Sequence, residues 1–197
     1  MSTYYFWTYF DIETLGLDPE NDKVISIQFQ NIVYDNEGRP IHDEQVLESI
    51  APGLHILKEW ESSEESIVKQ AFIELLAPDH REYFEPVGNN LIFEGRFMKS
   101  KLLKFGIIGT NQHLAFGQLN QIDLMPIMKL VNGGDRRTAQ FFGKVGENKN
   151  IPIYYRNKEY VKIESYIREE AKAFIKTMDY LMMKLPLMRR EILALHS

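Results

Sequence analysis

The chain of 197 residues contains no cysteine. This absence excludes disulfide bonds and thiolate metal sites, and it favours a reducing compartment, so we expect a cytoplasmic protein. The histidines are scattered along the chain without an H-x-x-x-H pair, so the sequence predicts no histidine metal site either.

Long apolar runs and an excess of basic residues are also missing. No uninterrupted hydrophobic segment approaches the roughly 20 residues that a helix needs to cross a bilayer. The N-terminal residues lack the pattern of a signal peptide, so we expect no membrane segment. The chain has 23 Lys and Arg against 28 Asp and Glu, for a net charge of −5, which slightly disfavours a nucleic-acid partner. A cluster of acids that holds cations would produce the same balance.

What the chain does contain is typical of a single globular domain, which we place at residues 1–197, with 44% hydrophobic and 26% charged residues. Residues 4–10, 24–34 and 44–52 have the pattern of strands. The turn-forming residues between them predict an antiparallel three-strand meander.

The hydrophobic period then changes. Ser62 and Glu65 stand at capping-box spacing before an apolar stripe and predict a helix. Residues 86–94 predict a fourth strand, residues 120–134 are ambiguous between strand and helix, and residues 158–185 predict a long amphipathic helix that Pro186 kinks or ends. Strands followed by alternating helices and a strand predict an α/β domain with a mixed sheet.

Asp11 and Glu13 follow the first apolar run, one residue apart. On a strand, residues i and i+2 face the same way, so both carboxylates share one side, with Phe10 and Ile12 on the other. Two neighbouring carboxylates repel each other unless a proton or a cation lies between them. For an isolated D-x-E, the alternative is that the strand has ended and both side chains are solvated in a turn.

Two further acids stand in apolar surroundings. Glu94 ends the run L-I-F, where the alternative to a ligand is a helix N-terminal acid that favours the helix dipole. Glu170 falls inside the apolar stripe of the last helix, with Tyr166 one turn earlier, and burying an unpaired charge there is costly. A buried ion pair and a bound metal would both satisfy this carboxylate.

Together these acids could converge on one site. Hard divalent cations such as Mg²⁺ take oxygen ligands, usually a few carboxylates plus water and phosphate. Two such ions about 3.5–4 Å apart can activate a water and stabilise the leaving oxygen of a phosphodiester. The chain has the acids that this chemistry needs.

Three segments resemble the motifs of the DEDD-type 3′–5′ exonucleases, a family of proofreading and RNA-trimming enzymes with a ribonuclease-H-like fold. The first family motif, D-x-E-T-x-G-L, is matched by Asp11, Glu13, Thr14, Gly16 and Leu17.

The other two motifs are matched with one change each. In the second, N-x-x-F-D, Asn90 and Phe93 match and Glu94 replaces Asp. In the third, the Y-x-x-x-D of the tyrosine subclass, Tyr166 matches and Glu170 replaces Asp. No histidine stands five residues before Glu170, which points away from the histidine subclass.

The resemblance implies a ribonuclease-H-like fold and a role for each matching residue. Two divalent cations, Mg²⁺ or Mn²⁺, would be held by Asp11, Glu13, Glu94 and Glu170. Tyr166 would orient the attacking water. The terminal nucleotide would be bound by Thr14, Leu15, Asn90 and Phe93.

The implied activity is that of a metal-dependent 3′–5′ exonuclease, with single-stranded 3′ ends of DNA or RNA as partners. The acidic charge and the two Glu replacements leave an alternative, a catalytically weakened ribonuclease-H-like domain that binds nucleic acid or a protein.

Three other features have a nucleic-acid interpretation beside a structural one. Residues 133–138, G-G-D-R-R-T, would grip phosphate or form a solvated loop. The lysines of residues 99–104 would flank nucleic acid or form a polar helix face. Tyr154, Tyr155 and Tyr160 would stack on bases or pack in the core.

Overall fold

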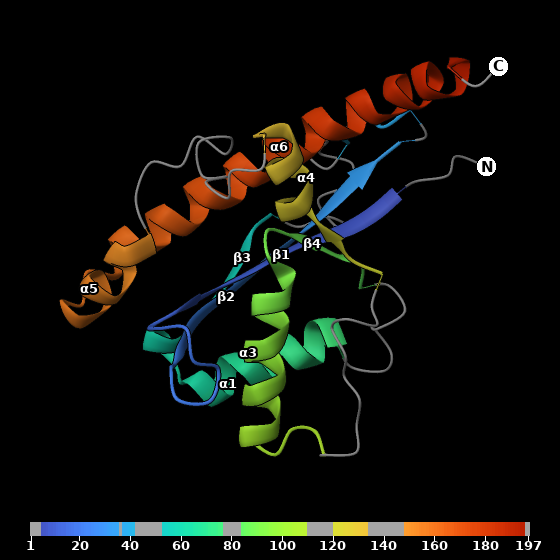
Figure 1. Ribbon diagram of the computed structural model, residues 1–197. Coiled ribbons are helices and arrows are strands. Elements are labelled where there is room, and N and C mark those ends of the chain that lie inside the picture. The colour runs from blue at the N-terminus through green and yellow to red at the C-terminus, as the bar shows by residue number, and fades with distance from the viewer. Residues whose placement is uncertain are drawn as a thin grey trace.

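The computed structural model describes residues 5–35, 37–41, 53–76, 84–109, 120–133 and 148–195. Its centre is a five-stranded sheet in the order β3-β2-β1-β4-β5 (Figure 1). The strands are β1 (Tyr5–Thr14), β2 (Val24–Tyr34), β3 (His55–Lys58), β4 (Pro86–Gly88) and β5 (Ile122–Asp123).

The strand directions confirm the predicted class. β1 and β2 form a long antiparallel hairpin, and β3 pairs antiparallel with β2. On the other side of β1, β4 is parallel to β1 and β5 is parallel to β4. The fold is therefore α/β, with the ribonuclease-H-like mixed sheet. The strand predicted at residues 44–52 lies outside the described residues, and His55–Lys58 forms the strand that pairs with β2.

Helices cover both faces of the sheet (Figure 1). One face carries α1 (Glu64–Ala71), which continues into the π-helix η3 (Phe72–Leu76), and α3 (Leu91–Lys104). The other face carries α6 (Tyr160–Ala194), with α4 (Leu124–Val131) beside it and α5 (Ile151–Arg156) leading into it. The short 3-10 helices are η2 (Glu59–Glu61) and η5 (Asn148–Asn150). No helix among the described residues combines the length and the apolar character that crossing a membrane requires.

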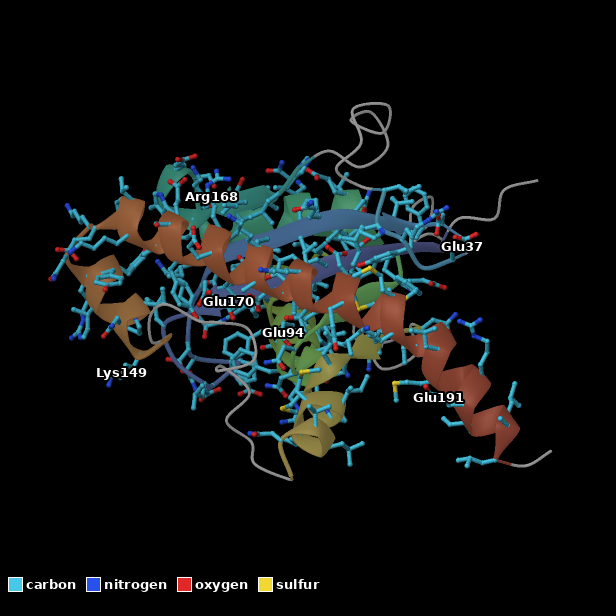
Figure 2. The ribbon with its side chains drawn as sticks, turned by 90° about the horizontal axis from the view of Figure 1, so that it is seen from above. Glu37, Glu94, Lys149, Arg168, Glu170 and Glu191 are labelled. Carbon is cyan, nitrogen blue, oxygen red and sulfur yellow. The ribbon has the colours of Figure 1, made fainter. Side chains whose placement is uncertain are left out.

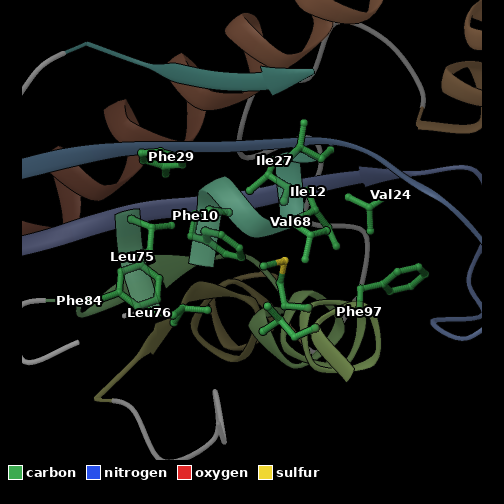
Figure 3. Close-up of a cluster of buried hydrophobic side chains, with 14 of the residues drawn as sticks. Phe10, Ile12, Val24, Ile27, Phe29, Val68, Leu75, Leu76, Phe84 and Phe97 are labelled. Atoms are coloured by element: carbon green, nitrogen blue, oxygen red, sulfur yellow. The ribbon is translucent and has the colours of Figure 1, made fainter. Parts of the chain in front are cut away.

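The alternation of β1 divides its side chains between the two helical layers. Phe10 and Ile12 belong to the buried cluster that includes residues of α1 and α3 (Figure 3). Tyr9 packs under α6 instead, with its ring centroid 5.0 Å from that of Phe174. Because alternate residues of a strand share a face, Asp11 and Glu13 point with Tyr9 into the α6 layer.

The start of α1 differs from the sequence prediction, and the ambiguous segment before residue 134 is resolved. The N-cap of α1 is Ser63, whose hydroxyl accepts the backbone N–H of Ser66, so the prediction of Ser62 as the cap is wrong by one residue. Residues 120–133 contain both candidate structures in succession, β5 and then α4.

The fourth strand is shorter than predicted. β4 stops at Gly88, and residues 91–94 already belong to α3. Asn90 turns the chain between them, because its backbone is left-handed with a φ of 74°. Glu94 therefore lies in the first turn of a helix and not at the end of a strand.

The helix α6 does not end at Pro186 but continues to Ala194. A proline has no N–H to donate to the carbonyl four residues earlier, here that of Met182. The chain after β2 approaches this carbonyl, since a Cβ on Gly38 would lie 2.5 Å from the Met182 oxygen. The Tyr34 hydroxyl also donates to Asp179 at 2.8 Å. These contacts hold α6 against the sheet as far as Met182.

Candidate metal centre

Three carboxylates converge between β1 and α6. Asp11, Glu13 and Glu170 each offer one oxygen, and these oxygens all lie within 4.8 Å of one another. Glu13 is buried, and the other two are half-buried. The strand period places the first two acids on the face that α6 covers, so the interpretation of Asp11 and Glu13 as solvated turn residues is wrong.

Asp11 is held by two neighbours on the same sheet. The Tyr9 hydroxyl donates to its Oδ2 at 3.3 Å, and the Gln28 side-chain amide donates to the same oxygen at 3.0 Å. Gln28 stands directly opposite Asp11 in the β1–β2 register. Burial, and then the Asp11 charge, raise the pKa of Tyr9 well above its ordinary value, so this hydroxyl keeps its proton and acts as a donor.

Glu94 lies close to this group but not within it. Its side chain is 4% exposed, and its Oε2 has no hydrogen-bond partner among the described residues. Burial raises the pKa of Glu94 well above its ordinary value, and the charges of Asp11, Asp123 and Glu170 raise it further. Figure 2 shows Glu94 at the start of α3 and Glu170 on the edge of α6 that is nearer to it in this view, whereas Arg168 lies on the opposite edge of α6. The structure thus brings the fourth predicted acid beside the other three, outside the 4.8 Å group.

Tyr166 belongs to the same site. Burial raises the pKa of its hydroxyl, and the charges of Glu170 and Glu13 raise it further. The hydroxyl is hydrogen-bonded to Glu170, one turn later on α6. A phenol with a raised pKa keeps its proton at neutral pH and acts as a hydrogen-bond donor.

The predicted substrate residues flank these acids on two elements. Thr14 and Leu15 follow Glu13 where the β1–β2 register shifts, and a bulge of this kind re-aims the chain as it leaves the sheet. The Thr14 hydroxyl donates to the Gly16 carbonyl at 2.6 Å, and Leu15 is partly buried. At the start of α3, Asn90 is the N-cap residue, and Phe93 packs against Phe97 with ring centroids 4.8 Å apart.

Sequence reasoning missed Asp123, the last residue of β5. Its Oδ1 accepts the backbone N–H of Met125 at 2.9 Å, which caps α4, and that of Asn90 at 2.8 Å. It therefore fixes the left-handed turn that precedes Glu94, and its charge is one cause of the raised Glu94 pKa. An acid directly before an apolar helical run is a recognisable cap signal. The hydrogen bond from Asn90 to Asp123 joins segments that are distant in the sequence, so only the folded structure reveals it.

Two of the candidate tyrosines have structural partners. Tyr155 donates its hydroxyl to Glu59, which also accepts from Lys23 at 2.9 Å. Tyr160 stacks on Trp60 with ring centroids 5.0 Å apart. These contacts favour a structural role for the tyrosines of this segment. Residues 134–138 of the G-G-D-R-R-T segment lie outside the described residues.

Comparisons with known proteins give weak matches. No family model matches the chain, and a search of curated proteins finds no match. A product-bound structure of exonuclease I is 13% identical, with a TM-score of 0.42, over 64% of this chain and 31% of that chain. Exonuclease I in complex with the inhibitor BCBP is 13% identical with a TM-score of 0.43, over 64% and 30%. A complex of exonuclease I with SSB-Ct is 14% identical with a TM-score of 0.39, again over 64% and 30%. The chain thus spans less than a third of the length of these proteins.

Proposed function

We propose that the protein is a metal-dependent 3′–5′ exonuclease that removes nucleotides from single-stranded ends of DNA or RNA. The observation that carries this proposal is the convergence of three carboxylate oxygens, from Asp11, Glu13 and Glu170, within 4.8 Å. These residues come from two of the three segments that resemble the exonuclease motifs. The third segment supplies Glu94, whose pKa is raised by burial and further by the charges of Asp11 and Glu170.

The donor set fits hard divalent cations, Mg²⁺ or Mn²⁺. All the donors are carboxylate oxygens, the ligands that such cations prefer. The buried Oε2 of Glu94, which has no hydrogen-bond partner among the described residues, is an acceptor that a cation would satisfy. Two cations would be held by Asp11, Glu13, Glu94 and Glu170. When bound, such ions lower the pKa of a water and stabilise the leaving oxygen of a phosphodiester.

The chain's own residues would position the reacting groups. Tyr9 and Gln28 fix the Asp11 carboxylate through its Oδ2. The charges of Glu170 and Glu13 both act on the Tyr166 hydroxyl. This hydroxyl would therefore orient the attacking water beside these two carboxylates. A positioned donor of this kind lowers the activation barrier because the water is already held in the orientation that the attack requires.

The terminal nucleotide would bind where two elements leave the sheet. Thr14 and Leu15 would contact it from the end of β1, and Asn90 and Phe93 would line its pocket from the start of α3. Asp123 would support this pocket indirectly, since it holds the Asn90 backbone at 2.8 Å.

One observation favours a second function. Glu94 lies outside the group of three carboxylates, and both Glu94 and Glu170 carry one methylene more than the family's Asp. A site displaced by one bond length would bind a cation and a nucleic-acid end without cleaving it efficiently. The second candidate is therefore a ribonuclease-H-like domain that binds nucleic acid or a protein partner and is weak in catalysis.

Incubation of the purified protein with labelled oligonucleotides in Mg²⁺, Mn²⁺ or EDTA tests the two functions. The exonuclease predicts a metal-dependent ladder from a 5′ label and early release of a mononucleotide from a 3′ label. Glu170→Gln should abolish it, whereas the exposed neighbouring acid gives a matched control, Glu169→Gln, that keeps the parent rate. Binding without shortening in either metal supports the second candidate and refutes the first.

A further inference from the structure

A hollow of about 620 Å³ lies between α3 and the turn that joins β1 and β2. Its walls include three basic side chains, Arg96, Lys99 and Lys104, and one acid, Glu20. The remaining lining residues are Pro19, Ser100 and Leu103.

The basic residues of α3 fall into two groups. Lys101 is fully buried and forms an ion pair with Glu64 at 3.3 Å in the protein interior. Arg96 and Lys99 are exposed and form no ion pair with any described residue. Lys104 has 48% of its side chain exposed and lies at 3.9 Å from Glu64, the distance of a loose pair. The helix therefore presents at least two uncompensated positive charges to the hollow.

Both walls of the hollow begin at the candidate metal centre. The first turn of α3 carries Glu94, and the β1–β2 turn follows Glu13 and Thr14. With a rise of about 1.5 Å per residue, Lys104 lies roughly 15 Å along α3 from Glu94. A chain of phosphates that leaves the centre along α3 would therefore pass the three basic residues in turn.

We propose that this hollow binds the sugar–phosphate backbone of the single strand whose 3′ end lies at the metal centre. The inference rests on the proposed function for its ligand. Contacts to phosphate give affinity without sequence preference and make it dependent on salt. The acid at the rim, Glu20, opposes this binding and limits its strength.

The test measures binding of labelled single strands of about 4 to 16 nucleotides by fluorescence anisotropy in EDTA, so that hydrolysis plays no part. Arg96→Ala, Lys99→Ala and Lys104→Ala together should weaken binding of the longer strands. The slope of log affinity against log salt should also become less steep by about 2, since each single-strand phosphate contact contributes about −0.7 to it. Glu20→Gln should tighten binding.

A matched control removes one Arg and two Lys from the exposed face of another helix. Arg168→Ala, Lys172→Ala and Lys176→Ala on α6 should leave the slope of the longer strands unchanged. Equal losses in both triple variants, or an unchanged slope in the α3 variant, overturn the hollow as the binding site. Because these readouts use EDTA, they are separate from the exonuclease test, in which loss of metal-dependent shortening overturns the proposed function alone.

A second inference concerns the end of α6 and does not depend on the site. Beyond the contacts at Met182, this helix exposes 42–80% of seven apolar residues, which are Met183, Leu185, Leu187, Met188, Ile192, Leu193 and Leu195. In Figure 1 this part of α6 extends past the sheet. Exposed apolar surface on this scale marks an interaction site.

Four of the exposed residues continue a regular stripe from the half-buried Leu181. Leu181, Leu185, Met188, Ile192 and Leu195 follow one another at spacings of four and three, the period of a two-stranded coiled coil. The same stripe, earlier on α6, packs against the sheet through Phe174 and Met178.

Charges beside the stripe select the occupant. Lys184 and Glu191 each directly precede a stripe residue, seven positions apart, and so flank the stripe on the same side. In an antiparallel pair with Leu185 opposite the partner's Met188, Lys184 faces the partner's Glu191, and the second ion pair follows by symmetry. We infer that residues 181–195 pair antiparallel with the same segment of a second copy of this chain.

The test uses sedimentation equilibrium of the full chain over a wide concentration range, because a contact of two heptads is small. The parent should dimerise reversibly. Lys184→Glu and Glu191→Lys should each weaken the dimer by at least about ten-fold, which is about 1.4 kcal/mol. The two changes together should restore it. The control Leu193→Ser removes an exposed apolar side chain outside the stripe and should leave the dimer intact.

Orientation is tested with introduced cysteines, since the chain has none of its own. Met188→Cys lies near the two-fold axis and should form a disulfide-linked dimer, whereas Leu195→Cys should not. A monomeric parent, a double charge variant that fails to recover, or efficient linkage of Leu195→Cys overturns the antiparallel pair.

Discussion

The hydroxyl of Tyr166 is hydrogen-bonded to the carboxylate of Glu170, one turn further along α6. The two residues therefore form a unit in which a proton donor fixes one of the converging acids. In the proposed mechanism the same hydroxyl orients the attacking water, so its two contacts can be separated by experiment.

Tyr166→Phe removes this hydroxyl and keeps the ring in its buried site. We expect the hydrolysis rate to fall by about 10²–10⁴-fold, the range for a lost acid–base or positioning group. The Kd for Mn²⁺, measured by isothermal titration, should hardly change. A variant with the parent's rate removes Tyr166 from the mechanism, and a Kd that worsens in step with the rate assigns the hydroxyl to Glu170 alone.

The buried carboxyl of Glu94 should make the metal-free protein sensitive to pH. Burial and the charge of Asp11 raise its pKa in the folded state above the ordinary 4.5. The folded protein then holds a proton that the unfolded chain has lost, so the free energy of unfolding falls as pH rises from about 4.5 through the raised value. The loss is about 1.4 kcal/mol for each pH unit between the two values.

Thermal unfolding in EDTA at several pH values measures this effect. Glu94→Gln should have a higher melting temperature than the parent at neutral pH, and the difference should vanish toward acid pH. The exposed acid Glu169 supplies the control, Glu169→Gln, which should follow the parent at every pH. Parallel pH curves for the parent and Glu94→Gln contradict the assignment of this buried carboxyl.

Added cations should relieve the repulsion among the acids. A ligand that binds only the folded state stabilises it by about 2.7 kcal/mol at 100 times its Kd, which is roughly 5–10 °C for a chain of this size. We expect Mn²⁺ or Mg²⁺ to raise the melting temperature of the parent. Asp11→Asn should raise the metal-free melting temperature and weaken the response to the ions. If this variant leaves both unchanged, the acids do not act as one cluster.

The sequence predicts the candidate site better than it predicts the boundaries around it. Asp11 and Glu13 share a face because side chains alternate along a strand. If the strand turned these acids to the other face, it would also remove Phe10 and Ile12 from the core, so tertiary structure preserves the predicted orientation. Glu170 follows in the same way from the period of a helix.

What the sequence did not predict depends on contacts between distant segments. Strand β4 ends early because Asn90 is left-handed, and that conformation is held by Asp123, whose position only the fold reveals. Pro186 was expected to kink or end α6. The helix nevertheless continues to Ala194, although a proline has no N–H to donate to the carbonyl four residues earlier.

Substitution of Gly38 tests whether the chain after β2 fixes the position of α6. Its φ is 77°, and a Cβ there would lie 2.5 Å from the Met182 carbonyl oxygen. Gly38→Ala should lower the free energy of unfolding by about 2–4 kcal/mol, measured by urea denaturation, since backbone strain and a clash add. The control is Gly106→Ala, with a φ of 64° and open space around the Cβ, which should cost only about 1 kcal/mol. Equal losses in the two variants mean that the chain after β2 yields easily and does not fix α6.

The two glutamates that replace the family's aspartates decide how well the centre would work. Each has one more rotatable bond, so it loses more rotamer freedom when a metal fixes it. Each also moves its oxygens by about one C–C bond unless the backbone retreats, and Mg²⁺ demands near-ideal octahedral geometry. Glu94 also lies outside the group of three carboxylate oxygens that are within 4.8 Å of one another. We therefore expect activity that is weak with Mg²⁺ and clearly higher with Mn²⁺.

Glu94→Asp and Glu170→Asp together test whether the backbone has adjusted to the longer side chains. Because Glu94 already lies apart from the other acids, shortening it should take its oxygens further from them, and we expect the Mg²⁺ rate to fall. A rise in the Mg²⁺ rate means that the longer arms obstruct the ions and that the backbone has not retreated. Rates are measured on a 5′-labelled strand in each metal, with Glu169→Asp as the control for the same change on an exposed side chain. Unaltered kinetics in both metals mean that neither glutamate is a ligand, and the centre then reduces to Asp11 and Glu13, too few acids to hold two ions.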